Sequence, residues 1–214
     1  MAAVDFNPTV EATTHDLLTL SECKLLLGMS TTDTTNDAQL TLLISTNSQT
    51  IARMCNRIFA KETGVESWRE TFDGRLFLTH FPVKAADIVS VTDAGGTIAS
   101  SQYELEVRSG KLSYRTSSDA LAAPWQTPVY VTYTGGYNLP SEAPLPLKKA
   151  CATLIMEERM RMIQAQVAGI RQVSHREARV TFFDPNAVLL RLGGKSPSQQ
   201  AVESLLRQYT RFWV

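Results

Sequence analysis

The sequence lacks several features that would assign a function at once. Its 214 residues include only three cysteines and three histidines, and 21 basic and 21 acidic side chains cancel to zero net charge. No apolar run comes near the ~20 residues that span a bilayer, so we expect no membrane contact. The first sixteen residues have no basic start and no apolar centre. We therefore expect no signal peptide and folding in a cytoplasm.

The cysteines and histidines are too scattered to indicate a metal or redox site. Cys23, Cys55 and Cys151 form no C-x-x-C pair, and each falls on an apolar helical stripe. In such a place free cysteine behaves as a small hydrophobic residue. The three histidines are equally dispersed. We expect buried thiols, no metal ion and no cofactor.

Motifs of catalysis and nucleotide binding are also missing. G-x-S-x-G, H-E-x-x-H and G-x-G-x-x-G do not occur. Gly193 to Ser196 resembles the end of a phosphate-binding loop, but Leu189 stands where the first glycine is required and Pro197 follows. Glu157 and Glu158 are neighbours on a helix and point apart. The sequence does not indicate an enzyme.

The composition that remains is that of a globular protein with an uneven charge distribution. Hydrophobic residues make up 43% and charged residues 20%. Residues 1–139 carry 10 basic and 15 acidic side chains, a balance of −5, whereas residues 140–214 carry 11 and 6, a balance of +5. This asymmetry suits a head-to-tail contact between copies or a basic end meeting an acidic partner. A chance distribution of charged residues is an equally good explanation of the asymmetry.

Helical periodicity occurs on both sides of a region with strand periodicity. The stretch SECKLLLG predicts a short helix, with Ser21 as N-cap and Gly28 just past its end. Residues 37–59 predict a long helix with one buried face, and Thr34 with Asp37 predicts its capping pair. A second long helix is expected to start at Pro144 or Pro146. A last helix is expected within residues 197–214.

From about Val65 the period changes from 3.6 to 2. Turn dipeptides at Asp73-Gly74, Gly95-Gly96 and Ser109-Gly110 separate five or six short strands, and the last of these dipeptides predicts a hairpin. One more strand is expected in the stretch EARVTFF.

These patterns predict an α+β fold. A helical bundle of a short helix, two long helices and a C-terminal helix would hold an inserted small antiparallel β-sandwich or sheet. We divide the chain into a flexible leader (1–16), a first helical half (17–64), the β insertion (65–139), a second helical half (140–168) and a C-terminal extension with a strand and the final helix (169–214).

The second long helix has two apolar stripes. One stripe comprises Leu147, Cys151, Leu154, Ile155 and Met162. The other comprises Met156, Met160, Ile163 and Val167. One stripe suffices to pack on the chain's own core, so the second stripe predicts a contact between subunits. A deeply buried helix is the alternative.

The order of the segments resembles that of the head–tail connector proteins of long-tailed bacteriophages, also called adaptor or head-completion proteins. The likeness lies in the short helix closed by Gly28, the long helix ending in CNRIF, WRETFDG, LFLTHFPV with VSVT, and VTYTGGY with NLP before a helix. It extends from about Leu17 to Arg161. Residues beyond about Gln166 have no counterpart in it.

The resemblance implies a structural protein of the virion and no catalytic residues. About twelve copies would form a dodecameric ring at the head–tail junction, after assembly in the host cytoplasm. The ring would dock under the portal protein, extend the channel for double-stranded DNA, and receive a tail-side completion, stopper or tail terminator protein. Because the C-terminal region engages the portal in this family, we expect interface residues at Leu205, Tyr209, Phe212 and Trp213.

The basic C-terminal half leaves other functions open. Arg171, Arg176 and Arg179 could face the channel or DNA, and a small DNA-binding or DNA-processing accessory protein is the main alternative. A tail-completion or tail-tube protein would share the sheet but lack the long helices. We also predict that removal of residues 197–214 leaves a folded protein that no longer docks on heads.

Overall fold

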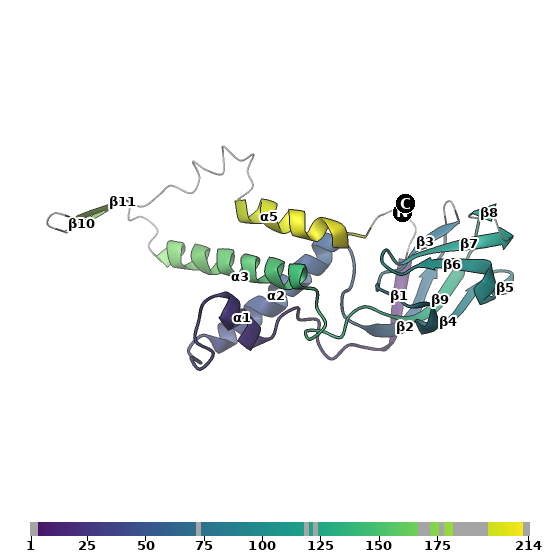
Figure 1. The fold of residues 1–214 in the computed structure, drawn as a ribbon, viewed down its shortest axis with the longest axis horizontal. Helices are drawn as coiled ribbons and strands as arrows, with labels where there is room; N and C mark the ends of the chain where they lie inside the picture. The colour runs from purple at the N-terminus through teal and green to yellow at the C-terminus, as the bar shows by residue number, and fades with distance from the viewer. Residues whose placement is uncertain are drawn as a thin grey trace.

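The four helices of the described chain lie beside the half of the molecule that contains β1 to β9, and the β10–β11 ribbon lies beyond the helices (Figure 1). The computed structural model describes residues 4–71, 74–117, 120–121, 124–166, 172–175, 178–181 and 197–211. The helical half contains α1 (Leu20–Leu26), α2 (Asp37–Cys55), α3 (Leu145–Gln166) and α5 (Pro197–Leu206). Most of the strands lie between α2 and α3 in the chain. The α+β prediction, with a β insertion between helical segments, is confirmed.

The N-terminal caps of the first two helices differ from those predicted. Thr19, and not Ser21, caps α1, because its side chain accepts from the Glu22 N–H while the Glu22 carboxylate accepts from the Thr19 N–H. This reciprocal pair is a capping box, and Glu22 stands at the spacing that it requires. Asn36 precedes α2 without a side-chain cap bond, so the predicted Thr34–Asp37 pair does not cap it.

The C-terminal ends of α1 and α2 each use a residue with positive φ. Gly28 has a φ of +68°, as predicted for the position after α1. The second helix ends at Cys55, four residues earlier than predicted, because Asn56 adopts the left-handed conformation with a φ of 51°. Asparagine tolerates this conformation better than most residues, and the chain turns there toward the strands.

One hydrophobic cluster holds the four helices together. Its fully buried members include Leu40 and Ile51 of α2, Leu147 and Ile155 of α3, and Leu206 of α5. All three cysteines are free and buried, as predicted. Burial raises the pKa of the Cys55 thiol to about 11 and that of Cys151 to about 12, so both remain protonated at neutral pH.

The β half is a sandwich of two antiparallel sheets. One sheet has the order β1-β2-β9-β4-β5, and the other has the order β3-β7-β6 with β8 also paired to β7. The strands are β1 (Val4–Val10), β2 (Glu62–Trp68), β3 (Arg75–Phe77), β4 (Ile88–Asp93), β5 (Gly96–Thr97), β6 (Tyr103–Glu106), β7 (Lys111–Ser117), β8 (Ala120–Leu121) and β9 (Val129–Gly135). Short 3-10 turns η1 (Ala85–Asp87) and η2 (Ser100–Gln102) precede β4 and β6.

The sandwich core explains which turns became hairpins. The hairpin at Ser109-Gly110 is confirmed, since β6 pairs with β7. No hairpin forms around Gly74, because β2 pairs with β9 and β3 pairs with β7 in the other sheet. Trp68 of β2 and Leu76 of β3 both belong to the buried cluster between the sheets. Each strand therefore presents its apolar side to the same interior from opposite layers.

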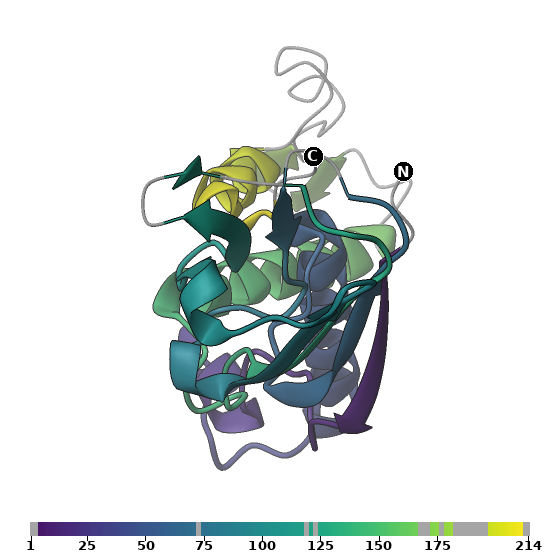
Figure 2. The ribbon, with the colours of Figure 1, turned by 90° about the vertical axis from the view of Figure 1, so that its right-hand side faces the viewer.

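The N-terminal segment assigned to a flexible leader instead supplies the edge strand β1. Val4–Val10 pairs antiparallel with β2 along the sheet edge (Figure 2). The Phe6 ring lies 4.0 Å from the His80 ring, centroid to centroid, and packs on the sandwich core. A Cβ atom on Gly64 would lie 2.5 Å from the Asn7 carbonyl oxygen, so β1 needs a glycine at this position.

The Gly135-Gly136 pair joins the β half to the helical half. A Cβ atom on Gly135 would lie 2.3 Å from the His80 carbonyl oxygen, and Gly136 has a φ of +102°. The next N–H, of Tyr137, donates to the Phe59 carbonyl at 2.8 Å. The chain thus passes from β9 toward α3 in close backbone contact with the segment that leaves α2.

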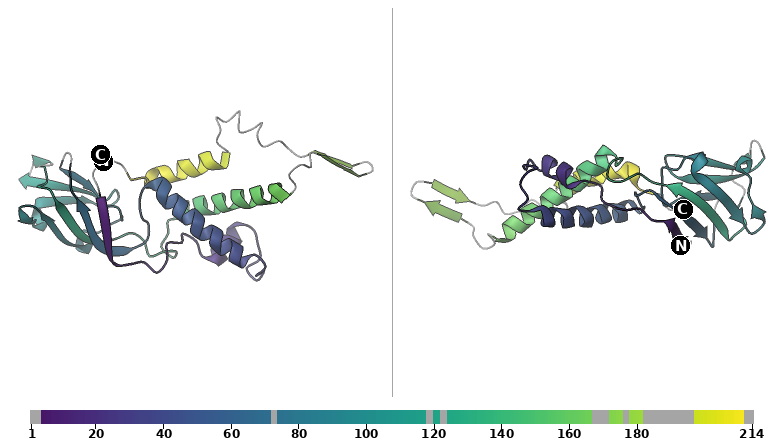
Figure 3. Two further views of the ribbon diagram at one scale, coloured as in Figure 1. Left: turned by 180° about the vertical axis from the view of Figure 1, so that it is seen from behind. Right: turned by 90° about the horizontal axis from the view of Figure 1, so that it is seen from below.

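Two elements lie beyond α3 in the chain. A ribbon of β10 (Gln172–His175) and β11 (Ala178–Thr181) projects at the end of the molecule opposite the β half (Figure 3). The predicted strand in EARVTFF corresponds to β11. The predicted last helix is α5, followed by the 3-10 turn η3 (Arg207–Tyr209). No helix within the described ranges is long and apolar enough to cross a membrane.

Candidate interaction surfaces

A buried carboxylate at the junction of the two halves collects several donors. Glu66 of β2 is 0% exposed. It accepts from the Thr79 N–H at 2.9 Å, the Thr79 hydroxyl at 2.5 Å and the Tyr133 hydroxyl. Burial raises the pKa of Glu66, although the Arg211 charge and these donors oppose the rise.

Arg211 brings the only cation that pairs with Glu66 among the described residues. Its guanidinium lies 3.5 Å from the Glu66 carboxylate, 2.9 Å from the Thr79 hydroxyl, and in contact with the Phe77 carbonyl. The Arg211 N–H donates to the Cys55 carbonyl at 2.8 Å. Arg211 therefore joins the last residue of α2 to the β half, and we call these contacts the Arg211 clasp.

Two further buried bases lie beside the clasp. The Arg57 guanidinium stacks 3.2 Å from the Phe81 ring centroid, and burial lowers its pKa to about 10. His80 Nε2 lies 2.9 Å from Glu62 Oε2, and burial lowers the His80 pKa to about 4. These groups fill a tightly packed seam. Within the described part of the chain, no three His, Cys, Asp or Glu side chains could hold a metal ion.

The outward face of α3 is unusually apolar. Met156, Met160 and Ile163 are each about half exposed, whereas Leu147, Cys151 and Ile155 on the opposite face are fully buried. Leu145 continues the outward face and is 79% exposed. Because 156, 160 and 163 differ by a four- and a three-residue step, they form one stripe about 11 Å long, and Leu145 lies on the same side of the helix eleven residues earlier.

An apolar groove of about 530 Å³ lies at the N-terminal end of α3, where α1, α3 and α5 meet. Leu25 and Leu26 of α1, Leu145 of α3 and Leu205 of α5 line it. Lys148 and Lys149 stand at its rim, and Lys148 forms an ion pair with Glu22. The first turn of α3 contains no acidic residue, so the helix end adds positive potential there.

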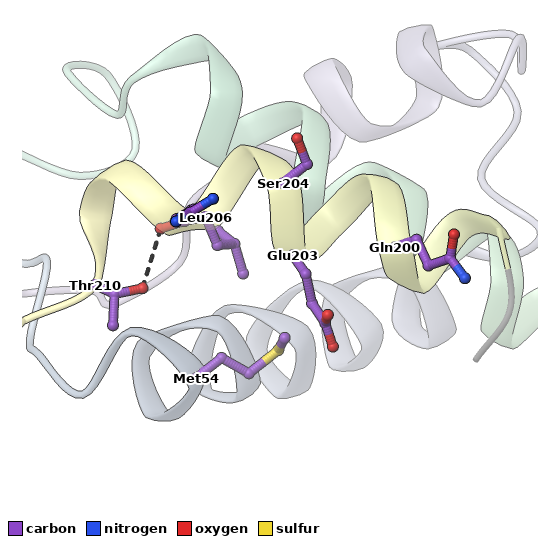
Figure 4. Close-up of a pocket in the computed structure, with 7 residues that line it drawn as sticks. Met54, Gln200, Glu203, Ser204, Leu206 and Thr210 are labelled. Atoms are coloured by element: carbon purple, nitrogen blue, oxygen red, sulfur yellow. Dashed lines mark hydrogen bonds between the residues drawn. The ribbon is translucent and has the colours of Figure 1, made fainter. Parts of the chain in front are cut away.

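A second depression lies between α2 and α5 (Figure 4). It encloses about 450 Å³, and Met54 of α2 lies opposite Glu203 and Leu206 of α5. The Thr210 hydroxyl donates to the Leu206 carbonyl at 3.2 Å and closes one end. Its lining combines a thioether with amide, carboxylate and hydroxyl groups, without the apolar continuity of the first groove.

The structure describes some of the predicted interface residues and not others. Leu205 and Tyr209 are half-buried against the helical core, with the Tyr209 ring edge-on to Phe59 at 6.4 Å. Arg179 lies on β11, of which the backbone is described. Phe212, Trp213, Val167, Arg171 and Arg176 lie outside the described residues.

Sequence reasoning missed the groove leucines. Leu25 and Leu26 belong to the run KLLLG of the predicted short helix, and Leu25 is 73% exposed. A helix of seven residues has one buried face and cannot turn three consecutive leucines inward. The three consecutive leucines could therefore have indicated that at least one of them is exposed.

The basic C-terminal half is partly neutralised within the chain. Lys148 pairs with Glu22 and Arg211 with Glu66, and both carboxylates lie outside residues 140–214. Fewer cations therefore remain for phosphates than the charge balance of residues 140–214 suggests.

The comparisons with known proteins identify a family and similar folds. A model of the head completion protein family matches residues 16–168. No curated protein matches the sequence. The fold is similar to a chain in the virion of a native gene transfer agent particle, with a TM-score of 0.54, 15% identity, and coverage of 98% of this chain and 96% of that chain. A chain in the neck of an empty gene transfer agent particle, computed with C6 symmetry, has a TM-score of 0.54, 16% identity and coverage of 98% and 97%.

Proposed function

The chain belongs to the head completion protein family, and we propose that it assembles as a ring beneath the portal, around the path of the DNA. The protein has a structural role at the head–tail junction of a virion. In the proposal, about twelve copies extend the DNA channel and present a surface to the tail-side completion protein.

The exposed apolar stripe of α3 is the main observation that supports the proposed ring. Met156, Met160 and Ile163 lie on a helix whose opposite face already packs on the chain's own core. An apolar face left over after folding is typical of a subunit contact. The neck structure computed with C6 symmetry supports a rotational assembly, because a ring of twelve equivalent copies also has six-fold rotational symmetry.

We assign the C-terminal extension to contacts with other proteins of the junction. The β10–β11 ribbon projects from the helical end (Figure 3), and a two-stranded ribbon is marginally stable alone. Docking on the portal would cover it. Arg171, Arg176 and Arg179 remain our candidates for contact with the channel or DNA.

Replacement of Met160 and Ile163 by glutamate tests the ring. Both side chains are half exposed, so the chain should fold with an unchanged circular dichroism spectrum. Buried charges at the contact should abolish self-association in sedimentation velocity and the joining of tails to heads in a reconstitution assay. Self-association and tail joining at the unmodified level would contradict the proposal.

A further inference from the structure

Glu62 fastens the N-terminal segment of the chain to the β half. It is the first residue of β2 and is buried. One carboxylate oxygen, Oε1, accepts from the Ala12 N–H at 3.3 Å and lies 3.5 Å from His15 Nε2. The other oxygen, Oε2, lies 2.9 Å from Nε2 of His80. The segment that precedes α1 and the interior of the junction therefore meet on a single side chain.

His80 in turn supports the strand β1. The Phe6 ring of β1 packs against the imidazole at a centroid distance of 4.0 Å. The His80 side chain is fully buried, and its backbone N–H donates to the Tyr133 hydroxyl at 3.1 Å. Release of β1 would remove the Phe6 ring and open the imidazole to water.

The neutral form of His80 suits these contacts better than the charged form. Because Nε2 faces the Glu62 carboxylate, the neutral imidazole carries its proton on Nε2 and leaves Nδ1 as an acceptor. Within the described part of the chain, Nδ1 is buried and has no hydrogen-bond partner. Protonation would add an N–H there that no group accepts, which is costly away from water. In an opened segment, water would accept from it.

Charged and titratable groups face His80 from several elements. Glu62 of β2 favours a positive imidazole, whereas charges on Arg57 after α2 and on His15 of the N-terminal segment oppose it. The Tyr133 ring of β9 lies 6.3 Å from the imidazole, and burial raises the Tyr133 pKa, so this group stays neutral. Burial of His80 outweighs the attraction of Glu62 and lowers the His80 pKa to about 4.

We propose that residues 4–16 form an acid-sensitive latch: neutral His80 keeps β1 in place, and protonation of His80 opens the segment while the other strands and the helices stay folded. Opening frees the edge of β2 that β1 occupies. An uncovered strand edge can pair with another strand, so the latch controls access to this edge.

The strand β1 is the part of the sheet that can leave at the least cost. It pairs on one side only, with β2, and its register shifts between Pro8 and Val10. By contrast, β2 also pairs with β9 along its whole length, from Glu62 to Trp68. An edge strand of this kind can open locally without unfolding the sheet behind it.

The direction of the pH dependence follows from the exposure of His80 on opening. In the open state the His80 pKa returns toward its ordinary value of 6.5, against about 4 in the closed state. The closed state has its full advantage above pH 6.5 and loses it as the pH falls toward 4. Between pH 7.5 and 5 the opening equilibrium should rise about 30-fold. Ordinary carboxylates remain mostly ionised in this window.

Amide hydrogen exchange of the unmodified chain at pH 7.5 and pH 5 measures the opening. After correction for intrinsic exchange rates, the protection of residues 4–10 should fall about 30-fold, whereas that of β6 should change little. The control suits the test because β6 is also an edge strand and its two carboxylates pair with Lys111 and Arg115 at the surface. An equal fall in both strands, or no fall in β1, would overturn the latch.

Two variants identify the group that takes up the proton. His80→Gln keeps a donor toward Glu62 but cannot be charged, so the protection of β1 should become nearly independent of pH. His15→Gln changes a half-exposed side chain and should preserve most of the effect. A fall in β1 protection that persists in His80→Gln would overturn the assignment to His80.

An NMR titration of the unmodified chain decides the question even if His80→Gln fails to fold. At pH 5 the imidazole signals of His80 should remain those of the neutral form. A charged His80 at pH 5 beside a β1 that keeps its protection would overturn the latch. Neither measurement depends on self-association, so the outcome is independent of the proposed ring.

Discussion

Arg211 reaches from the last described turn of the chain into the β half, where its guanidinium meets the buried carboxylate of Glu66. The two residues are 145 positions apart, and nothing in the local sequence links them. A buried carboxylate without a cation costs several kcal/mol, so the contact fixes the C-terminal segment against both halves.

The Arg211 clasp makes a testable contribution to stability. Arg211→Met should lower the free energy of unfolding by about 3–5 kcal/mol, because Glu66 stays buried without its cation. The double variant Arg211→Met with Glu66→Gln should recover at least about 1 kcal/mol, because no charge is then left unpaired. Urea unfolding measures both, with exposed Arg207→Met as the control. Simple additivity of the two single changes would contradict the pairing.

His80 should make stability depend on pH. Its pKa is about 4 in the folded chain against an ordinary value of 6.5, owing first to burial, with Glu62, Arg57 and His15 as its charged neighbours. The unfolded chain therefore binds the proton more readily between pH 6.5 and 4. The contribution of neutral His80 is complete above pH 6.5 and is lost as the pH falls through this window, by up to about 3 kcal/mol.

The change His80→Gln should flatten this dependence in urea unfolding series at pH 4 to 7. His15→Gln is the comparison, because that side chain is about half exposed and has the smallest effect among the charged neighbours on the His80 pKa, so it should change the slope far less than His80→Gln. If the free energy of unfolding of His80→Gln still falls steeply as the pH is lowered, the carboxylates and not His80 cause the pH dependence.

Among the secondary-structure elements, β1 shows how a polar segment of low apparent propensity joins a fold. Its residues offer one large apolar side chain, Phe6, and a proline, Pro8. The strand pairs with β2 because Gly64 leaves room for Phe6 and for the Asn7 carbonyl. This close approach is a tertiary effect, so the periodicity of residues 1–16 could not reveal it.

Gly64→Ala should therefore displace β1 selectively. The added methyl group would collide with backbone at 2.5 Å, which a side-chain rotation cannot relieve. We expect a loss of about 1–3 kcal/mol and faster amide hydrogen exchange in residues 4–10, whereas the helices keep their protection. Ser90→Ala on β4, which pairs with β9 and not with β1, serves as control. Unchanged exchange in β1 would show that the strand does not depend on this glycine.

Helix periodicity predicted α2, α3 and α5 and most of the buried side of each, because one face of each packs on the shared core. Met162, assigned to the core stripe of α3, is instead 38% exposed. Strand periodicity did not predict that β2 pairs with β9 in place of β3. The choice of sheet depends on the buried interior that Trp68 and Leu76 share, which is a tertiary contact. Helix periodicity also could not show that Leu25 and Leu145 stay exposed. Only the positions of α1 and α5 around α3 reveal the groove.

The prediction that removal of residues 197–214 leaves a folded chain needs revision in light of α5. Val202 and Leu206 are buried in the helical core, and Arg211 closes the buried site of Glu66. We expect such a truncation to destabilise the protein, so a loss of docking would not identify an interface. The shorter removal of residues 212–214 retains these contacts.

The whole molecule has two halves with different tasks in the proposed ring. The β half presents sheet edges and turns at one end, and the helical half carries the apolar stripe and the groove (Figure 1). The Gly135-Gly136 passage and the Arg211 clasp join the halves firmly. Copies arranged side by side would thus keep a uniform channel, because each presents the same surfaces at the same level.

Electron microscopy of DNA-filled heads incubated with the purified chain tests the ring most directly. We predict density of rotational symmetry at one vertex beneath the portal, with α3 of each copy packed against its neighbour and a continuous channel along the axis. Single copies bound without lateral contact, or α3 faces turned to solvent around the axis, would contradict the account.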